Sequence, residues 1–447
     1  MISNLVLFGA SGDLTGRFLL PALATLRASG RLGEEFAVVG TARAPWGDEA
    51  FRRYAAERLA EHAADVPLEH REALTRSLRY RPADVTDAND VATVIRLTHG
   101  APVAAYLALP PGLFRPTVTA VGAAGLPPGS RIALEKPFGE SLHDAVALNQ
   151  VLAGVVGEAG ERAVFRVDHA LGMATVQNLL ALRRHDPVLA AVWDGQHIEQ
   201  VEVRWEEDLA LEGRADYYDG TGALKDVMQN HMLQVLCVLA MEPPAGPGER
   251  ALRDAKIAAL RAARLPGPDE AAGCMRRARY GAGRIGDSPV PAYADEEGVE
   301  PDRGTETFAE VVLELDAPRW RGTRFVLRAG KALAARRKEA VVRFRATEPD
   351  RAPSCLRIGI DGPFDVAVQL TGLAPMTLTG PPPASDVPPY GHVLLDLLDG
   401  GSTLSVRGDG AEEAWRVVEP VLAAWREQRV PLEEYPAGSD GPPPVAH

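Results

Sequence analysis

The sequence is poor in cysteine, in net positive charge and in long apolar runs, and each absence excludes a class of protein. Its three cysteines, Cys237, Cys274 and Cys355, are widely spaced, so neither a disulfide framework nor a cysteine zinc site is expected. A formal net charge of −13 argues against nucleic acid or an anionic membrane surface as partner, because both require a basic face. No apolar run is long enough to span a bilayer, and a strand-like run already begins at Leu5. We therefore expect no signal peptide, no membrane association and a cytoplasmic protein.

A length of 447 residues predicts two domains, and the N-terminal third has the pattern of an α/β domain. Uninterrupted apolar runs alternate there with helical stretches, at Leu5–Phe8, Phe36–Val39, Ala104–Leu109 and Ile132–Leu134. Runs of this kind are typical of buried parallel strands joined by crossover helices. We predict a doubly wound, Rossmann-like α/β domain over residues 1–168.

The pattern changes beyond Asp168. Two helical segments, Ala174–Arg184 and Asp226–Met241, flank an alternating strand at His197–Trp205. From Thr307 onward, strand-like segments follow one another without crossover helices, which indicates a mostly antiparallel sheet. We predict an α+β second domain with a large, mostly antiparallel sheet over residues 169–447.

The first chemical motif is a glycine-rich turn between a predicted strand and a predicted helix. Its candidate binding residues are Gly9, Ser11, Gly12, Asp13 and Leu14. Glycines let the backbone approach a phosphate, and a helix N-terminus supplies free N–H groups. The turn therefore favours a dinucleotide site, although its spacing is not G-x-G-x-x-G and an ordinary glycine turn would also fit.

The end of the second strand distinguishes between the two common dinucleotides. An NAD enzyme usually carries an acidic residue there, which accepts hydrogen bonds from the ribose hydroxyls. This sequence has Arg43 in the run Gly40–Arg43 and no carboxylate. A guanidinium suits a 2′-phosphate, so the pattern favours NADP over a merely solvated loop arginine.

Three further candidates follow predicted strands of the first domain. Lys136 comes after Ile132–Leu134, and Asp168 with His169 comes after Ala163–Val167. Ligands bind at the carboxyl ends of parallel strands, and a carboxylate beside a histidine can orient the imidazole. A surface ion pair for Lys136, and a capping aspartate next to a chance histidine, remain open at this point.

Polar residues also interrupt a long apolar helix in the second domain. Asp226, Asn230, His231 and Gln234 fall on one arc of its helical projection. Polar groups in so apolar a helix are costly unless they have partners or a function. A histidine here is either a satisfied core residue or part of a working site, and the surrounding amides and carboxylate favour the site.

With these motifs in place, the sequence resembles the glucose-6-phosphate dehydrogenase family. The matching stretches occur in family order along nearly the whole chain, and jointly they are highly specific. They are GASGDL, GTAR, YLALPP, EKPFG, RVDHALG, VQNLLALR, EGRADYYD, DVMQNHMLQ, PDRGTETFAE, RAGKAL and GAEEAWRVVEPVLAAW.

The resemblance implies oxidation of the C1 hydroxyl of a glucose-type sugar to a lactone, with hydride transfer to NADP. It implies His231 as the general base, with Asp168 as its partner. The implied substrate-binding residues are Lys136, His169, Glu207, Asp226, Lys331 and Arg336. The implied cofactor-binding residues are Gly9, Ser11, Gly12, Asp13, Leu14, Arg43, Pro110 and Lys136. We expect no metal. The resemblance implies a homo-oligomer, specifically a dimer.

Three departures from the family pattern affect the site for a sugar phosphate. Ala170 stands where the family has tyrosine, Met173 where it has lysine, and Gly359 where it commonly has glutamine. Three readings stay open: the orthodox activity, a family member for an unphosphorylated or nucleotide-linked sugar, or a non-catalytic NADP-binding protein. Retention of His231 and Asp168 speaks against the last reading.

Overall fold

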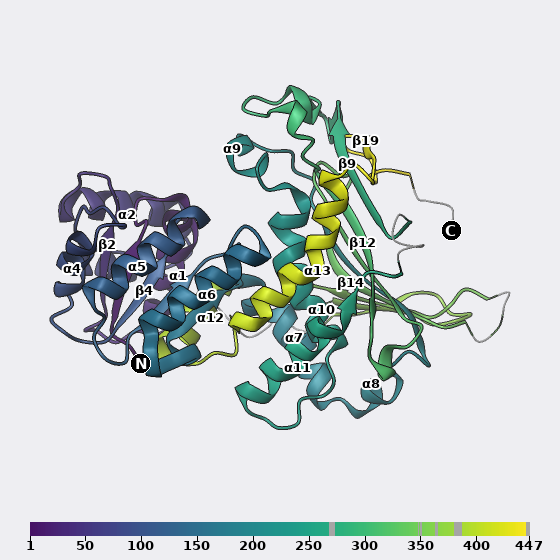
Figure 1. Cartoon of the computed structure of the whole chain (residues 1–447), viewed down its shortest axis with the longest axis horizontal. Coiled ribbons are helices and arrows are strands. Elements are labelled where there is room, and N and C mark those ends of the chain that lie inside the picture. The colour runs from purple at the N-terminus through teal and green to yellow at the C-terminus, as the bar shows by residue number, and fades with distance from the viewer. Residues whose placement is uncertain (268–272, 347, 349–350, 363–364, 380–386, 444–447) are drawn as a thin grey trace. The chain divides into compact units, whose positions relative to one another are not determined.

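The computed structural model describes residues 1–267, 273–346, 348, 351–362, 365–379 and 387–443, and the chain forms two compact units (Figure 1). Unit 1 comprises Met1–Met173 and Ser385–Glu412, and unit 2 comprises Ala174–Ala384 and Glu413–His447. Residues 387–412, which separate the two segments of unit 2 in the sequence, thus belong to unit 1. The predicted division into a cofactor-binding domain, residues 1–168, and a substrate-binding domain, residues 169–447, stays a prediction.

Unit 1 is built on a seven-stranded sheet of order β18-β6-β5-β4-β1-β2-β3. All its pairs are parallel except β18 with β6, so the predicted Rossmann-like α/β fold is confirmed. The strands are β1 Asn4–Phe8, β2 Ala37–Thr41, β3 Leu78–Tyr80, β4 Val103–Leu107, β5 Arg131–Leu134, β6 Val164–Val167 and β18 Ser405–Val406.

Helices connect the parallel strands of unit 1. The helix predicted after the glycine-rich turn begins with a π-helical turn, η1, and continues as α1. The helical elements are η1 Thr15–Leu19, α1 Leu20–Ala28, α2 Asp48–His62, α3 Leu68–Ser77, α4 Ala88–Arg96, α5 Phe114–Ala124, α6 Leu142–Val156, the 3-10 turn η4 His169–Gly172 and α12 Pro389–Asp399.

Helix α12 shows why residues 387–412 belong to unit 1. Val393, Leu394 and Leu397 of this helix are completely buried. Burial of one such side chain contributes about 1.5–3 kcal/mol, so α12 is part of the core of unit 1. The guanidinium of Arg131 also donates to the carbonyl oxygen of Leu397 over 2.7 Å.

Unit 2 contains the predicted large sheet. Its main path runs β17-β16-β15-β14-β7-β13-β12-β9-β19, and β8 pairs with β12. Only β7 with β13 and β9 with β19 are parallel among the pairs of the described residues, so the mostly antiparallel sheet is confirmed. The strands are β7 Ile198–Glu206, β8 Ala263–Arg264, β9 Met275–Gly281, β12 Phe308–Leu315, β13 Arg324–Gly330, β14 Arg337–Phe344, β15 Cys355–Gly359, β16 Asp365–Gln369, β17 Met376–Thr379 and β19 Leu432–Pro436, with a separate hairpin of β10 Gly283–Ile285 and β11 Ser288–Val290.

Helices α7, α10 and α11 lie along one side of this sheet (Figure 1). The helix predicted over Asp226–Met241 is a π-helix, η5, followed by the fully buried α10. The helical elements of unit 2 are α7 Ala174–His185, α8 Pro187–Val192, α9 Ala215–Tyr218, η5 Leu224–Met232, α10 Leu233–Ala240 and α11 Glu249–Ala262, while α13 Gly408–Arg426 crosses the division between the units.

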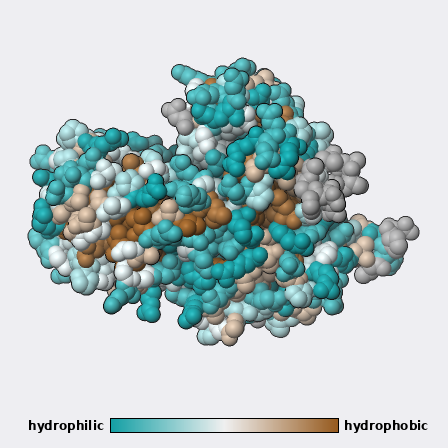
Figure 2. All heavy atoms as spheres, viewed as in Figure 1, coloured by the Kyte–Doolittle hydropathy of each residue, from teal (hydrophilic) through white to brown (hydrophobic). Residues whose placement is uncertain are grey.

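Hydrophilic residues cover most of the visible face of the molecule (Figure 2). Among the described residues, no helix is both long and apolar enough to cross a membrane.

Candidate active site

The predicted ligand-binding residues of unit 1 gather at one edge of its sheet. Strands β1, β2, β4, β5 and β6 are parallel, so their carboxyl ends meet at the same edge. Each of these five strands is followed within three residues by a predicted ligand-binding residue: Gly9, Arg43, Pro110, Lys136, and the pair Asp168 and His169. This edge is where dinucleotides bind in folds of this topology.

The turn after β1 requires glycine at its first position. Gly9 has a φ of +88°, and a Cβ atom there would collide with the carbonyl oxygen of Ala108. Only glycine tolerates both conditions at no steric cost. The turn is closed by the N–H of Gly12, which donates to the carbonyl oxygen of Gly9 over 3.0 Å. Ser11, Asp13 and Leu14 complete the connection to η1, and Asp13 forms an exposed ion pair with Arg17.

Arg43 lies on a loop that the adjacent strand holds in place. The hydroxyl of Tyr80, at the end of β3, lies 2.9 Å from the carbonyl oxygen of Ala44 and 3.2 Å from that of Ala42. The Arg43 side chain is exposed between these two anchored residues. A fixed backbone with an exposed guanidinium fits the binding of an anionic group on the cofactor.

Lys136 follows a buried carboxyl group. Burial raises the pKa of Glu135 to about 7, although a hydrogen bond from Tyr106 and the charge of Lys136 act in the opposite direction. Nearby, the hydroxyl of Tyr390 on α12 lies 3.5 Å from Nδ1 of His169, and its ring stacks on the same imidazole with centroids 5.2 Å apart. This cluster fixes the backbone from which Lys136 and His169 extend.

Asp168 begins the turn η4. It is buried, and its Oδ1 accepts from the N–H of Ala170 over 3.0 Å. Ala170, in the place of the family tyrosine, is completely buried. Met173, in the place of the family lysine, is partly exposed.

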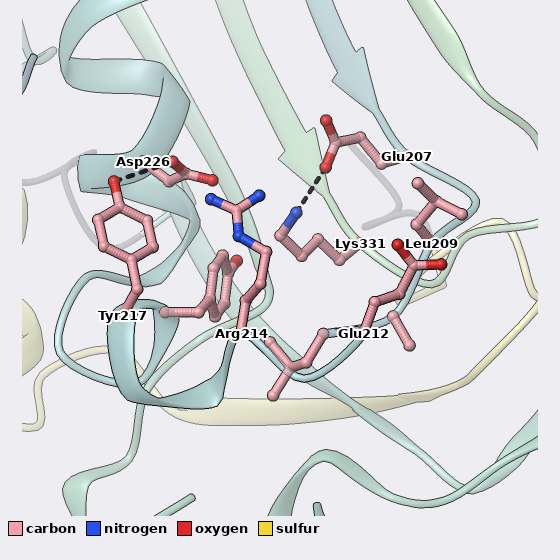
Figure 3. A pocket seen from close by; sticks show the side chains of 10 residues that line it. Glu207, Leu209, Glu212, Arg214, Tyr217, Asp226 and Lys331 are labelled. Carbon is pink, nitrogen blue, oxygen red and sulfur yellow. Dashed lines mark hydrogen bonds and ion pairs between the residues drawn. The ribbon is translucent and has the colours of Figure 1, made fainter. Parts of the chain in front are cut away.

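In unit 2, three predicted substrate-binding residues line one pocket (Figure 3). These are Glu207 after β7, Asp226 on η5 and Lys331 after β13. Lys331 donates to Glu207 over 2.5 Å, and its ammonium also lies 5.1 Å from the ring centre of Tyr218. These three residues present two carboxylates and one ammonium to the pocket, which are hydrogen-bond groups suited to a polyhydroxy ligand.

The cations beside Glu207 keep this residue ionised. Burial alone would raise the pKa of Glu207, but attraction and a hydrogen bond from Lys331, with help from Lys338, lower that pKa overall. Lys338 lies 3.5 Å from the second carboxylate oxygen. Glu207 therefore acts as a hydrogen-bond acceptor in the pocket.

His231 is buried on the π-helix η5, with an exposed fraction of 2%. In a π-helix, residues five positions apart are one turn apart, so His231 lies on the same side of η5 as Asp226. The imidazole stacks on the indole of Trp205 with ring centroids 5.3 Å apart. Trp205 precedes Glu207 by two residues and therefore projects from the same face of the chain.

A buried carboxyl group fixes the start of η5. Glu306 accepts from the N–H of Leu224 over 3.0 Å, and burial raises the pKa of Glu306 to about 7. Gly222, with a φ of +70°, leaves room for this carboxyl group, because a Cβ atom there would collide with it. Glu306 thereby positions the helix that carries Asp226 and His231.

Arg336, a predicted substrate contact, has a carboxylate partner. It pairs with Asp361, which follows β15 and also lies 3.7 Å from the ammonium of Lys338. Gly359, in the place of the family glutamine, ends β15 two residues earlier. Asp361 thus neutralises part of the positive charge that Arg336 and Lys338 would offer to a phosphate.

Sequence reasoning missed several residues of the site. Arg214, Tyr217 and Glu212 line the pocket, and their signal was present in the stretch EGRADYYD. Tyr217 donates to Asp226 over 3.4 Å, and Arg214 lies over the Tyr217 ring (Figure 3). Trp205 and Asp361 gave no recognisable signal, because each depends on contacts between elements far apart in sequence.

The comparisons with known proteins cover both units. The family model "Glucose-6-phosphate dehydrogenase, NAD binding domain" matches residues 6–178. The model "Glucose-6-phosphate dehydrogenase, C-terminal domain" matches residues 180–357 and 376–447. A glucose-6-phosphate 1-dehydrogenase of Treponema pallidum (strain Nichols) is 36% identical, over 98% of this chain and 92% of that protein.

Solved structures agree with the family models. A glucose-6-phosphate dehydrogenase in complex with its substrate glucose-6-phosphate matches with a TM-score of 0.89 and 28% identity, over 99% of this chain and 96% of that chain. Glucose-6-phosphate 1-dehydrogenase from Mycobacterium avium matches with a TM-score of 0.86 and 31% identity, over 99% and 95%. The chain therefore belongs to the glucose-6-phosphate dehydrogenase family and is an oxidoreductase with a dinucleotide-binding N-terminal domain.

Proposed function

We propose that this chain oxidises the C1 hydroxyl of a glucose-type sugar to a lactone, with NADP as the hydride acceptor. The observation that carries the proposal is the pocket of unit 2, where Glu207, Asp226 and Lys331 converge on the side of η5 that also carries His231. Alcohol oxidation requires a proton acceptor and groups that orient the hydroxyls. The pocket supplies the orienting groups, and His231, on the same helix as Asp226, is the candidate proton acceptor.

His231 is the proposed proton acceptor for the C1 hydroxyl. Glu207 and Asp226 are the proposed acceptors for hydroxyl groups of the sugar, and Lys331 is a donor to a sugar oxygen. The lowered pKa of Glu207, held down against burial by Lys331 and Lys338, keeps that carboxylate available as an acceptor at neutral pH. The buried position of His231 excludes water from the proton transfer.

NADP is the proposed cofactor, and it supplies the nicotinamide ring that receives the hydride. The glycine turn after β1 allows the backbone to approach a pyrophosphate, with η1 and α1 behind it. Arg43 is the proposed contact to the 2′-phosphate, and Pro110 and Lys136 contribute from the ends of β4 and β5. The absence of a carboxylate between Thr41 and Gly47 favours NADP over NAD.

Asp168 and His169 keep the roles that the family resemblance implies. Asp168 is the proposed partner of His231 and His169 a proposed substrate contact, with Lys136 shared between substrate and cofactor. The buried environment of Asp168 and the stacking of His169 on Tyr390 support defined side-chain positions within unit 1.

A spectrophotometric assay of NADPH formation tests the proposed reaction. Glucose 6-phosphate is the first substrate to supply, because the similar solved structure contains it. Glucose and nucleotide-linked glucose complete the panel. NADP reduction with at least one of these sugars is the expected result. If no sugar of the panel supports NADP reduction, the chain is a non-catalytic NADP-binding protein.

A second candidate substrate is a sugar without a phosphate, and three observations favour it. Met173 offers no charge where the family has lysine, and Ala170 offers no hydroxyl where the family has tyrosine. Arg336, which remains, is paired with Asp361. In the assay panel, faster turnover of glucose or nucleotide-linked glucose than of glucose 6-phosphate would establish this alternative.

We also propose a homodimer in the cytoplasm, as the family resemblance implies. The low cysteine content is compatible with a reducing compartment. Analytical ultracentrifugation tests the dimer, and a mass of a single chain at working concentration would refute it.

A further inference from the structure

Trp205 contacts both the proposed general base and a group of charged side chains. Its indole is stacked on the imidazole of His231, with centroids 5.3 Å apart and planes inclined by 25°. Trp205 and His231 are both almost completely buried, with exposed fractions of 3% and 2%. The imidazole therefore has an aromatic face as a neighbour in a dry environment.

The same indole also contacts a cation. The ammonium of Lys338 lies 4.6 Å from the centre of the Trp205 ring. Lys338 is in turn 3.5 Å from Glu207 and 3.7 Å from Asp361, so two carboxylates offset its charge. The indole thus contacts both the imidazole and a charged group that adjoins the pocket.

We propose that Trp205 is a positioning residue for the reaction, which orients the imidazole of His231 and stabilises the imidazolium that forms when His231 accepts the sugar proton. This inference rests on the proposed function. The electron-rich face of tryptophan attracts a cationic imidazolium more strongly than it attracts a neutral imidazole. The attraction is larger when both partners are shielded from water.

This attraction accelerates the reaction because it becomes stronger as the imidazole gains charge. As the proton acceptor, His231 gains positive charge during the transfer, so the indole binds the transition state more strongly than the ground state. An interaction of this kind raises kcat and leaves KM largely unchanged. If Trp205 served only for packing, its loss would lower the stability of the protein without a selective loss of kcat.

The test compares Trp205→Leu, which removes the aromatic face, with Trp205→Phe, which keeps one. The readouts are kcat and KM for the best sugar of the panel, the Kd for NADP and the Tm. We expect Trp205→Leu to lower kcat on the order of tenfold and Trp205→Phe by less than about threefold. The KM and the Kd for NADP should stay within about twofold of wild type.

Trp320→Leu is the matched control. Trp320 is a buried tryptophan of the same unit, its indole N–H donates to the carbonyl oxygen of Ala240, and its ring packs on that of Phe325. Its loss should lower the Tm and leave kcat unchanged. If Trp205→Leu does not fold, Trp205→Met fills most of the space without an aromatic face and takes its place.

The outcomes separate the two claims. A kcat of the leucine or methionine variant within about threefold of wild type, or an equal loss in the phenylalanine variant, would overturn the role of Trp205 while the proposed function stands. A wild-type protein that reduces no NADP, or a His231→Asn variant that turns over normally, would refute the proposed function and this inference together.

Discussion

At the scale of single residues, the choice of cofactor depends on Arg43. Its guanidinium is exposed on a loop that Tyr80 holds in place, so Arg43→Ala should leave the fold intact. A lost charged hydrogen bond should weaken NADP binding by about 1.5–3 kcal/mol and leave NAD binding unchanged. Isothermal titration calorimetry with each cofactor measures both values.

Arg96→Ala is the control for this experiment. Arg96 is an exposed arginine of the same unit, at the end of α4. Its loss should change neither Kd. Equal weakening of NADP and NAD by Arg43→Ala would contradict a contact to the 2′-phosphate.

A second residue-scale prediction concerns Met173. Met173→Lys restores the charge that the family has at this position, and the partly exposed side chain makes the change tolerable. The KM for glucose 6-phosphate should fall roughly tenfold or more, since one charged hydrogen bond is gained, while the KM for glucose stays constant. Steady-state kinetics with both sugars provides the measurement.

Met376→Lys adds the same charge at an exposed position of β17 and serves as the control. The companion change Ala170→Tyr is unsuitable, because Ala170 is completely buried and a large ring would overpack the site. An unaltered protein that already uses glucose 6-phosphate with a micromolar KM would show that Met173 and Ala170 do not weaken phosphate binding.

At the scale of elements, the start of η5 should make stability depend on pH. The pKa of Glu306 is raised by burial from about 4.5 to about 7, so the folded chain holds the proton more tightly than the unfolded chain. The resulting stabilisation is fully present below about pH 4.5 and is lost as the pH rises through about 7, with at most about 3 kcal/mol at stake.

Glu306→Gln should flatten this dependence. Glutamine cannot ionise, and its carbonyl oxygen can still accept from the N–H of Leu224. Urea unfolding between about pH 5 and pH 8 compares the two proteins, with Glu314→Gln, on the strand β12 that follows Glu306, as the control. Identical slopes for wild type and Glu306→Gln would contradict the buried carboxyl group as the origin.

The elements themselves could be predicted where their pattern is local. The apolar runs gave β1, β2, β4 and β5 to within a few residues, since a buried parallel strand is apolar throughout. The π-helical winding of η5 could not be predicted, because it depends on tertiary contacts such as that of Glu306 with Leu224. The return of α12 and β18 to unit 1 was missed for a similar reason, as the pairing of β18 with β6 joins distant parts of the chain.

At the scale of the whole molecule, the order of motifs carried more information than any single motif. The family could be identified from the sequence because its motifs recur in order, and the comparisons confirm it. The pocket of Glu207, Asp226 and Lys331 was anticipated by resemblance alone, since these residues lie on three separate elements. The contacts of Trp205 and Asp361 could be identified only once the register of β7, β14 and β15 was known.

The measurement that tests the account most directly is the turnover of His231→Asn. We expect the rate of NADPH formation to fall on the order of 10²–10⁴-fold, because asparagine cannot accept the sugar proton. The Kd for NADP and the Tm should remain those of wild type. Normal turnover by this variant would contradict the account, and His169 would then be the next candidate for the proton acceptor.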